Sequence, residues 1–234
     1  MKKYFTFLFT SLLLFSCDPA ALDKLMQSSP LSNADVAKGL KEALNFGVDD
    51  AVKFLSAEDG YFGSPYKILL PAEARQVTDR LSKIPGFKNV ENEIIKKINR
   101  AAEDAAKSAG PIFLSAIKNM TFDDAMNILM GQQNAATQYL ERNTYTNLYS
   151  EFNPVINNSL NKYNALGYWA DAVNSYNKIP FVDKINPDLN DYITNKALEG
   201  LFSLVEKKEE GIRNDVSQRS TALLKKVFQK QDGN

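Results

Sequence analysis

The segment 90–109 carries the clearest helical pattern in the chain. Its apolar side chains recur every three or four residues, at Val90, Ile94, Ile98, Ala101 and Ala105. The opposite side is charged, and its pairs have the four-residue spacing that stabilises an exposed helix face: Glu93–Lys97 and Glu103–Lys107. Such a helix buries one stripe and needs other elements to cover it. The pattern therefore predicts a fold in which helices pack against helices.

Start and stop signals divide the rest of the chain into further helices. Ser32 or Asn33 is placed to cap a first helix, which Gly47 is expected to end or bend. Thr121 is placed to cap a short helix. A helix over about 133–150 follows, and then two helices within 152–182 that break near Gly167.

Two further stretches complete the expected fold. The motif Asn186-Pro187-Asp188 predicts the start of a long helix that reaches about residue 213. The least helical stretch is 58–71, which contains two glycines and a proline. We therefore predict an all-α protein: one compact multi-helix bundle domain over 32–230, with a short irregular or extended loop near 58–71.

The first residues have the pattern of a bacterial lipoprotein signal. Lys2 and Lys3 precede an apolar run over 4–15, and Ser16 then precedes Cys17, the only cysteine. The run is shorter than the roughly 20 residues that a membrane span needs. We predict a signal peptide over 1–16 and a lipidated tether over 17–31. The alternative is a secreted protein, or an uncleaved anchor, in which this cysteine has no such role.

Lipidation would place the protein in the bacterial envelope and exclude disulfides. Two or three acyl chains hold a protein firmly on a membrane, whereas one chain does so only weakly. The expected location is the outer membrane, with the domain facing the periplasm or, alternatively, the cell surface. Once Cys17 is acylated, no thiol remains in the chain. The domain must then be held together by its core.

Composition excludes several classes of function. The chain has 28 basic and 28 acidic side chains, and loss of Lys2 and Lys3 would leave a net charge near −2. This balance gives no reason to expect a nucleic acid partner. The chain contains no histidine, so a serine–histidine hydrolase is impossible. No sequence motif indicates a cofactor.

Short segments spread through the chain form an ordered set, at residues 39–44, 59–62, 68–71, 99–103, 111–113, 120–125, 135–137, 200–202, 209–213, 221–224 and 227–228. Together they resemble a family of bacterial lipoproteins and periplasmic proteins known as domain of unknown function 4197. The resemblance implies a mostly helical domain that is exported from the cytoplasm. It brings no activity, substrate or catalytic residue.

One candidate site is a polar cluster drawn from the residues Arg100, Glu103, Asp123, Asp124, Glu209, Glu210 and Arg213. If its carboxylates met, their oxygens would suit Ca²⁺ or Mg²⁺. The alternative, which we favour, gives each residue a local role. Asp123 and Asp124 suit the first turn of a helix, and Arg213 has the spacing to pair with Glu209 or Glu210.

A second candidate is an aromatic groove formed by Tyr163, Tyr168, Trp169 and Tyr176. Such rings offer flat faces and polar tips to sugars, peptides or apolar ligands. Trp169 and Tyr176 also have the spacing of a buried helix face, so core packing is the favoured interpretation. A third candidate is the loop 59–65, where Tyr61 and Phe62 either serve a ligand or seal one end of the bundle.

These observations predict a lipid-anchored envelope protein that acts as a non-catalytic binding or envelope-associated module. Its expected contacts are the membrane, through the lipid on Cys17, and an envelope protein partner. One alternative is a carrier of a lipid or other apolar ligand in a helical cavity. A second alternative is a carboxylate-metal enzyme, which requires at least three of the candidate carboxylates to meet in one cleft.

Overall fold

The computed structural model describes residues 32–71, 75, 78–79, 82–83, 88–162, 165–182, 184 and 189–229. The predicted signal peptide and the lipidated tether with Cys17 lie outside the described residues. Within the described part of the chain there are eight α-helices, one 3₁₀ helix and no β-strand. The prediction of a compact all-α fold is confirmed.

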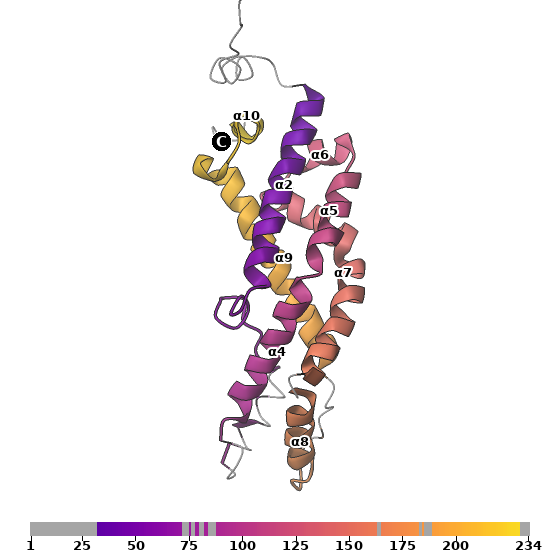
Figure 1. Ribbon diagram of the computed structural model, residues 1–234, viewed down its shortest axis with the longest axis vertical. Coiled ribbons are helices and arrows are strands. Elements are labelled where there is room, and N and C mark those ends of the chain that lie inside the picture. The colour runs from indigo at the N-terminus through magenta and orange to yellow at the C-terminus, as the bar shows by residue number, and fades with distance from the viewer. Residues whose placement is uncertain are drawn as a thin grey trace, which may run out of the picture.

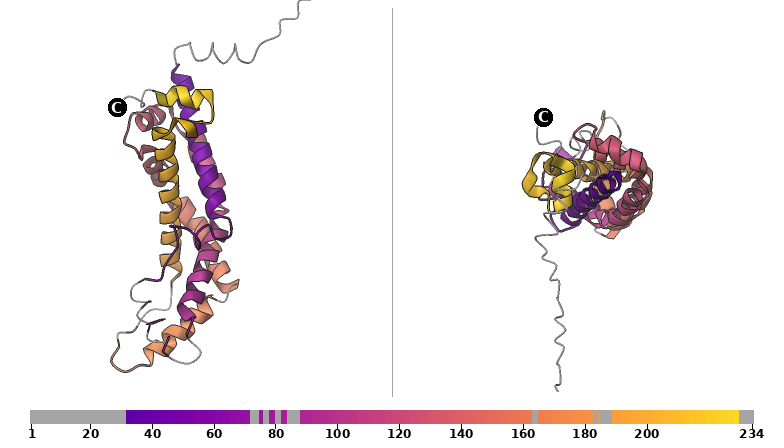
Figure 2. Two further views of the ribbon diagram at one scale, coloured as in Figure 1. Left: turned by 90° about the vertical axis from the view of Figure 1, so that its left-hand side faces the viewer. Right: turned by 90° about the horizontal axis from the view of Figure 1, so that it is seen from above.

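The helices form an elongated bundle (Figure 1). Their bounds are α2 (Asn33–Leu55), α4 (Val90–Ala106), α5 (Ala109–Asn119), α6 (Phe122–Leu129), α7 (Ala135–Lys162), α8 (Ala165–Asn177), α9 (Asn190–Asn214), η1 (Val216–Gln218) and α10 (Ala222–Phe228). Helices α2 and α4 follow one another along the long axis, and α9 runs beside them (Figures 1 and 2). Helix α7 packs mainly on α4 and α9, and α9 also packs on α2. No helix in the described part is long and apolar enough to cross a bilayer.

Helix α4 buries the apolar face that its pattern predicted. Ile94, Ile98, Ala101 and Ala105 are all buried. Small alanine side chains in the second half of this helix let neighbouring backbones approach closely. Helix α4 packs mainly against α7.

Helix α2 is longer than predicted. It begins at a capping box, in which the Ser32 hydroxyl accepts a bond from the Asp35 N–H at 3.2 Å and the Asp35 carboxylate accepts one from the Ser32 N–H at 3.0 Å. The expected end or bend at Gly47 is wrong, because the helix continues to Leu55. A helical glycine costs about 1 kcal/mol relative to alanine. The buried side chains of Leu44, Val48, Ala51 and Leu55 outweigh that penalty.

Helix α7 is also longer than predicted. Instead of ending near residue 150, it runs to Lys162 and contains Pro154. A proline removes one helical hydrogen bond, which a favourable tertiary contact can offset. Here Phe152, Ile156 and Leu160 are completely buried on both sides of the proline. Because α7 ends at Lys162 and α8 begins at Ala165, the chain passes from one helix to the next near Gly167, as predicted.

The stretch 58–71 is irregular, as predicted. It forms turns and then an extended segment, and Asp59 has a positive φ of 65°. Gly60 approaches the end of α2 so closely that an added Cβ would lie 2.3 Å from the Phe54 carbonyl oxygen. Only glycine fits there. The first turn of the loop therefore packs directly against the end of α2.

Candidate functional site

Glu103 forms the centre of a buried polar contact, here called the Glu103 lock. Its Oε1 accepts bonds from the N–H groups of Tyr61 and Phe62, each at 3.2 Å. Its Oε2 pairs with Arg100, and Arg100 also bonds Asp59 at 2.7 Å. The carboxylate is only 4% exposed, so these donors replace the water that it loses. The lock fastens the irregular loop to α4.

The aromatic ring of the same loop is fastened to α9. The Tyr61 hydroxyl donates to the Ala197 carbonyl at 2.7 Å, and its ring packs on Gly200, where a Cβ would lie 3.0 Å away. Burial, and then the nearby charge of Glu103, raise the pKa of Tyr61 far above its ordinary value. The hydroxyl therefore stays protonated and acts as a donor. Tyr61 is completely buried, so its ring packs in the core, and the loop that carries it lies midway along the bundle rather than at one end (Figure 1).

Glu209 forms the centre of a second buried contact, here called the Glu209 lock. Its carboxylate accepts the N–H of Ala136 at 3.0 Å, the N–H of Thr137 at 2.8 Å and the Thr137 hydroxyl at 2.9 Å. It also pairs with Arg213 at 2.8 Å. Arg213 donates to the Ile128 carbonyl at 2.8 Å. One ion pair of α9 thus provides hydrogen-bond partners for the first N–H groups of α7 and for a carbonyl group near the end of α6.

The predicted polar cluster is therefore divided among separate places. Asp124 closes a capping box with Thr121 at the start of α6, and the bonds from Thr121 lower the pKa of Asp124. Asp123 and Glu210 are exposed. Among the described residues, no group of three or more carboxylates is close enough to hold a metal ion. The candidate carboxylates therefore do not meet in one cleft, as a carboxylate-metal enzyme would require.

The aromatic candidates that can be placed belong to the core. Trp169 is 1% exposed and Tyr176 is 4% exposed, so neither lines an open groove. Tyr163 and the side chain of Tyr168 lie outside the described residues. The helical spacing of Trp169 and Tyr176 therefore reports packing, in agreement with the favoured interpretation.

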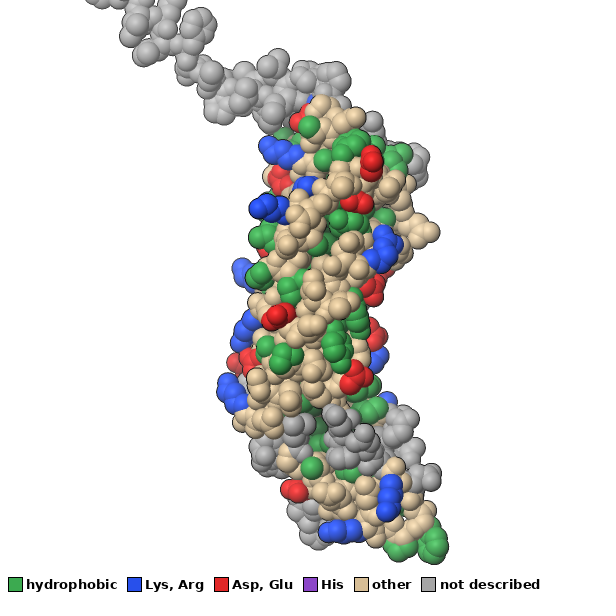
Figure 3. Space-filling model, turned by 90° about the vertical axis from the view of Figure 1, so that its right-hand side faces the viewer, with side chains coloured by type: hydrophobic (Ala, Val, Ile, Leu, Met, Phe, Trp, Pro, Cys, Tyr) green, Lys and Arg blue, Asp and Glu red, His purple; other side chains and the backbone are tan. Residues whose placement is uncertain are grey.

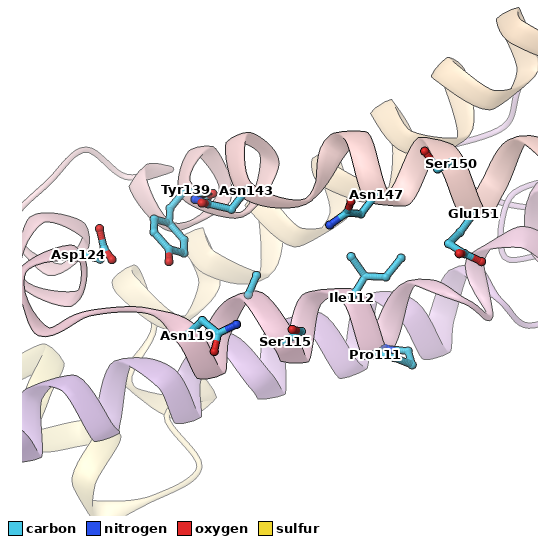
Figure 4. Close-up of a pocket in the computed structure, with 11 residues that line it drawn as sticks. Pro111, Ile112, Ser115, Asn119, Asp124, Tyr139, Asn143, Asn147, Ser150 and Glu151 are labelled. Atoms are coloured by element: carbon cyan, nitrogen blue, oxygen red, sulfur yellow. Dashed lines mark hydrogen bonds between the residues drawn. The ribbon is translucent and has the colours of Figure 1, made fainter.

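The structure instead presents an open groove between α5 and α7, here called the α5–α7 groove (Figure 4). Its volume is about 700 Å³. Uncharged polar side chains dominate its lining, with two carboxylates and a few apolar groups: Pro111, Ile112, Ser115, Ala116, Asn119, Asp124, Tyr139, Asn143, Asn147, Ser150 and Glu151. Figure 3 shows one side of the molecule, on which acidic and basic side chains are scattered and hydrophobic side chains lie between them. Among the described residues, no lysine or arginine lines the groove.

One wall of the groove is a ridge of α7. Tyr139, Asn143, Asn147 and Glu151 follow each other at four-residue intervals. At 3.6 residues per turn, these side chains drift by about 40° per step, or about 120° from Tyr139 to Glu151, and all four line the groove. Figure 4 shows the ridge facing Ser115 and Asn119 of α5 across the groove. The two helices therefore present polar side chains to the same space.

Many of the polar groups in the groove are free for a ligand. In the described part of the chain, Ser115, Asn119, Asn147 and Glu151 have no protein hydrogen-bond partner. Asn143 donates one bond to the Tyr139 carbonyl at 2.7 Å, which leaves its amide oxygen available. Burial, and then the charge of Asp124, raise the pKa of Tyr139. Its hydroxyl is therefore a donor at neutral pH.

Sequence reasoning missed this groove. Tyr139 was recognisable as one of many aromatic residues, but the asparagines had no evident role. The available signal was the four-residue repeat of exposed polar side chains from Tyr139 to Glu151. Which helix faces that ridge depends on tertiary packing, so the second wall could not be inferred.

Comparison with known proteins identifies a family. No curated protein and no solved structure matches the chain. The sequence model of one family, described as "Protein of unknown function (DUF4197)", matches residues 30–229. This range includes both locks and both walls of the α5–α7 groove. The chain belongs to the DUF4197 family of proteins of unknown function.

Proposed function

We propose that this protein is a lipid-anchored, non-catalytic binding module of the bacterial envelope, with the α5–α7 groove as its binding surface. The observation that carries the proposal is the set of unpartnered polar groups that face each other across the groove. An exposed polar group without a protein partner can bond a ligand without first breaking a contact in the fold. The candidate carboxylates Glu103 and Glu209, in contrast, are already engaged.

The anchor part of the proposal rests on the signal pattern that ends at Cys17. The first described helix, α2, begins at Asn33, only a short stretch of sequence after Cys17. Two or three acyl chains on Cys17 would hold the domain at a membrane surface. The groove would then face ligands or envelope proteins close to that membrane.

A carrier of apolar molecules is less well supported. That hypothesis relied on aromatic side chains that line a cavity, whereas Trp169 and Tyr176 are core residues. The α5–α7 groove is open, and its lining combines polar side chains with the apolar groups Pro111, Ile112 and Ala116. A binding module with a polar ligand fits this lining better.

The anchor is tested by metabolic labelling with an alkyne fatty acid in wild-type cells and in cells with Cys17→Ala. The wild-type protein is expected to carry the label and to sediment with membranes. The variant should lose the label and leave the membrane fraction. Equal membrane association of an unlabelled Cys17→Ala protein would contradict the lipid anchor.

The binding surface is tested by a photo-crosslinking amino acid placed at Ser115, inside the groove, or at Lys207, an exposed residue of α9. The Ser115 probe is expected to yield a discrete adduct in living cells, and the Lys207 probe should not. Loss of the adduct in an Asn147→Ala background would assign it to the groove. The same adducts from both probes would contradict a specific binding surface.

A further inference from the structure

The α5–α7 groove has a repeat that matches one class of ligand. We infer that it binds an extended, uncharged or basic peptide segment through the peptide backbone. This inference rests on the proposed binding function and adds the class of ligand. It is argued from the spacing of the ridge, the chemistry of its amides and the charge of the groove.

The spacing of the ridge is close to that of an extended chain. Each four-residue step from Tyr139 to Asn143, Asn147 and Glu151 rises about 6 Å along α7. Two residues of an extended peptide advance about 6.4–6.8 Å. A peptide that lies along the ridge would therefore present equivalent backbone groups to successive side chains. The whole ridge spans about 18 Å, which corresponds to five or six extended residues.

The side chains at the middle of the ridge have the chemistry of a peptide bond. An asparagine amide carries a donor N–H₂ and an acceptor oxygen, so it can pair with both a backbone C=O and a backbone N–H. Asn147 has no hydrogen-bond partner among the residues that the structure describes, and Asn143 retains its oxygen. Ser115 and Asn119 offer further bonds from the facing helix (Figure 4). The backbone of a peptide held in the groove would therefore form hydrogen bonds with both α5 and α7.

The charge of the groove selects against acidic ligands. Asp124 and Glu151 are its ionisable carboxylates, and no basic side chain lines it. The Asp124 carboxylate already accepts bonds from Thr121, whereas Glu151 has no ion pair among the described residues. A lysine or arginine of the ligand would therefore be favoured beside Glu151. Tyr139 is the sole aromatic ring in the lining, which gives a sugar little surface for stacking.

The experiment uses the full-length protein in detergent and an array of fluorescein-labelled hexapeptides with every side chain represented at each position. The best-binding peptide is then compared with its backbone N-methylated form, and chitotetraose serves as a glycan probe. N-methylation removes the N–H donors that an asparagine oxygen would accept. We expect at least tenfold weaker binding for the N-methylated peptide and for the Asn143→Ala/Asn147→Ala variant.

The matched control is Asn158→Ala, an exposed asparagine of the same helix that does not line the groove, and it should bind normally. A preference for a basic end residue should disappear in Glu151→Gln. Lack of binding across the array, or binding that ignores both N-methylation and the double variant, overturns the inference. Groove-dependent binding of chitotetraose alone would reject the peptide but leave the proposed binding function intact. Loss of crosslinks from Ser115 would instead reject that function.

Discussion

The Glu209 lock and the α5–α7 groove use polar side chains in opposite ways. In the lock, Glu209 is 7% exposed and Arg213 is 4% exposed, and their bonds join three helices. In the groove, Asn147 and Ser115 are exposed and bond no described part of the protein. Buried polar groups with partners stabilise a fold, whereas exposed groups without partners add little to it. The contacts that stabilise the fold and the proposed binding surface thus use different residues, although α7 takes part in both regions.

The largest effect on stability is expected from Glu209→Ala. The substitution leaves the Arg213 charge buried and removes the acceptor of the first N–H groups of α7. Removal of one partner from a buried ion pair destabilises by about 3–5 kcal/mol. Urea denaturation followed by far-UV circular dichroism measures the change. The control is Glu210→Ala at the next, exposed position, and an equal loss in both variants would contradict the role of the lock.

A smaller loss is expected from Glu103→Ala. The N–H groups of Tyr61 and Phe62 lose their acceptor, but Arg100 keeps Asp59 as a partner and its side chain is 15% exposed. We expect a loss of about 2–3 kcal/mol in the free energy of unfolding. Limited proteolysis should also cut the loop 58–66 more rapidly. A variant with a protected loop and wild-type stability would show that Glu103 does not fasten it.

The capping box of α6 predicts a dependence on pH. Bonds from Thr121 lower the pKa of Asp124, so its contribution is present above the ordinary carboxyl pKa of about 3.9 and is lost as the pH falls through the lowered value. Because Asp124 is near the surface, that contribution is less than about 1 kcal/mol. The stability difference between wild type and Asp124→Asn should shrink between pH 5 and pH 2, as urea titrations would show. A stability difference that grows as the pH falls would contradict the expected direction of the pH dependence.

The smallest effect on stability is expected from the groove. Asn143→Ala/Asn147→Ala removes side chains that face solvent, and alanine favours a helix. The free energy of unfolding should change by less than about 0.5 kcal/mol per site. Thermal and urea denaturation are sufficient to measure it. A loss as large as that of Glu103→Ala would show that these asparagines belong to the fold, which would remove the distinction between the two regions.

The sequence predicted the parts of the fold that depend on local rules. The periodicity of α4, the cap at Thr121 and the start of α9 after the Asn186-Pro187-Asp188 motif are all properties of neighbouring residues. Gly47 misled the prediction, because buried apolar neighbours override a local helix breaker. Helix α7 likewise continues through Pro154, beyond its predicted end. Whether such a residue ends a helix depends on contacts made by distant segments.

The candidate sites show the same limit, because local patterns do not predict contacts between distant segments. The spacing of Glu209 and Arg213 indicated a pair on one helix face, and that pair is formed. Its bonds to Ala136, Thr137 and Ile128 join residues that lie more than 70 positions away in the chain. No local pattern encodes such partners. For the same reason the α5–α7 groove, whose two walls come from different helices, was missed by the sequence analysis.

Pro154 has a consequence for motion at the end of the groove. Without an N–H, it cannot donate to the carbonyl of Ser150, which lines the groove four residues earlier. One backbone hydrogen bond of α7 is therefore missing where the ridge ends. We expect this turn of α7 to open locally more often than the turns around Leu140, and amide hydrogen exchange can compare the two. The part of the wall near Tyr139 would then hold a bound ligand in place, while the end near Glu151 would adjust to it.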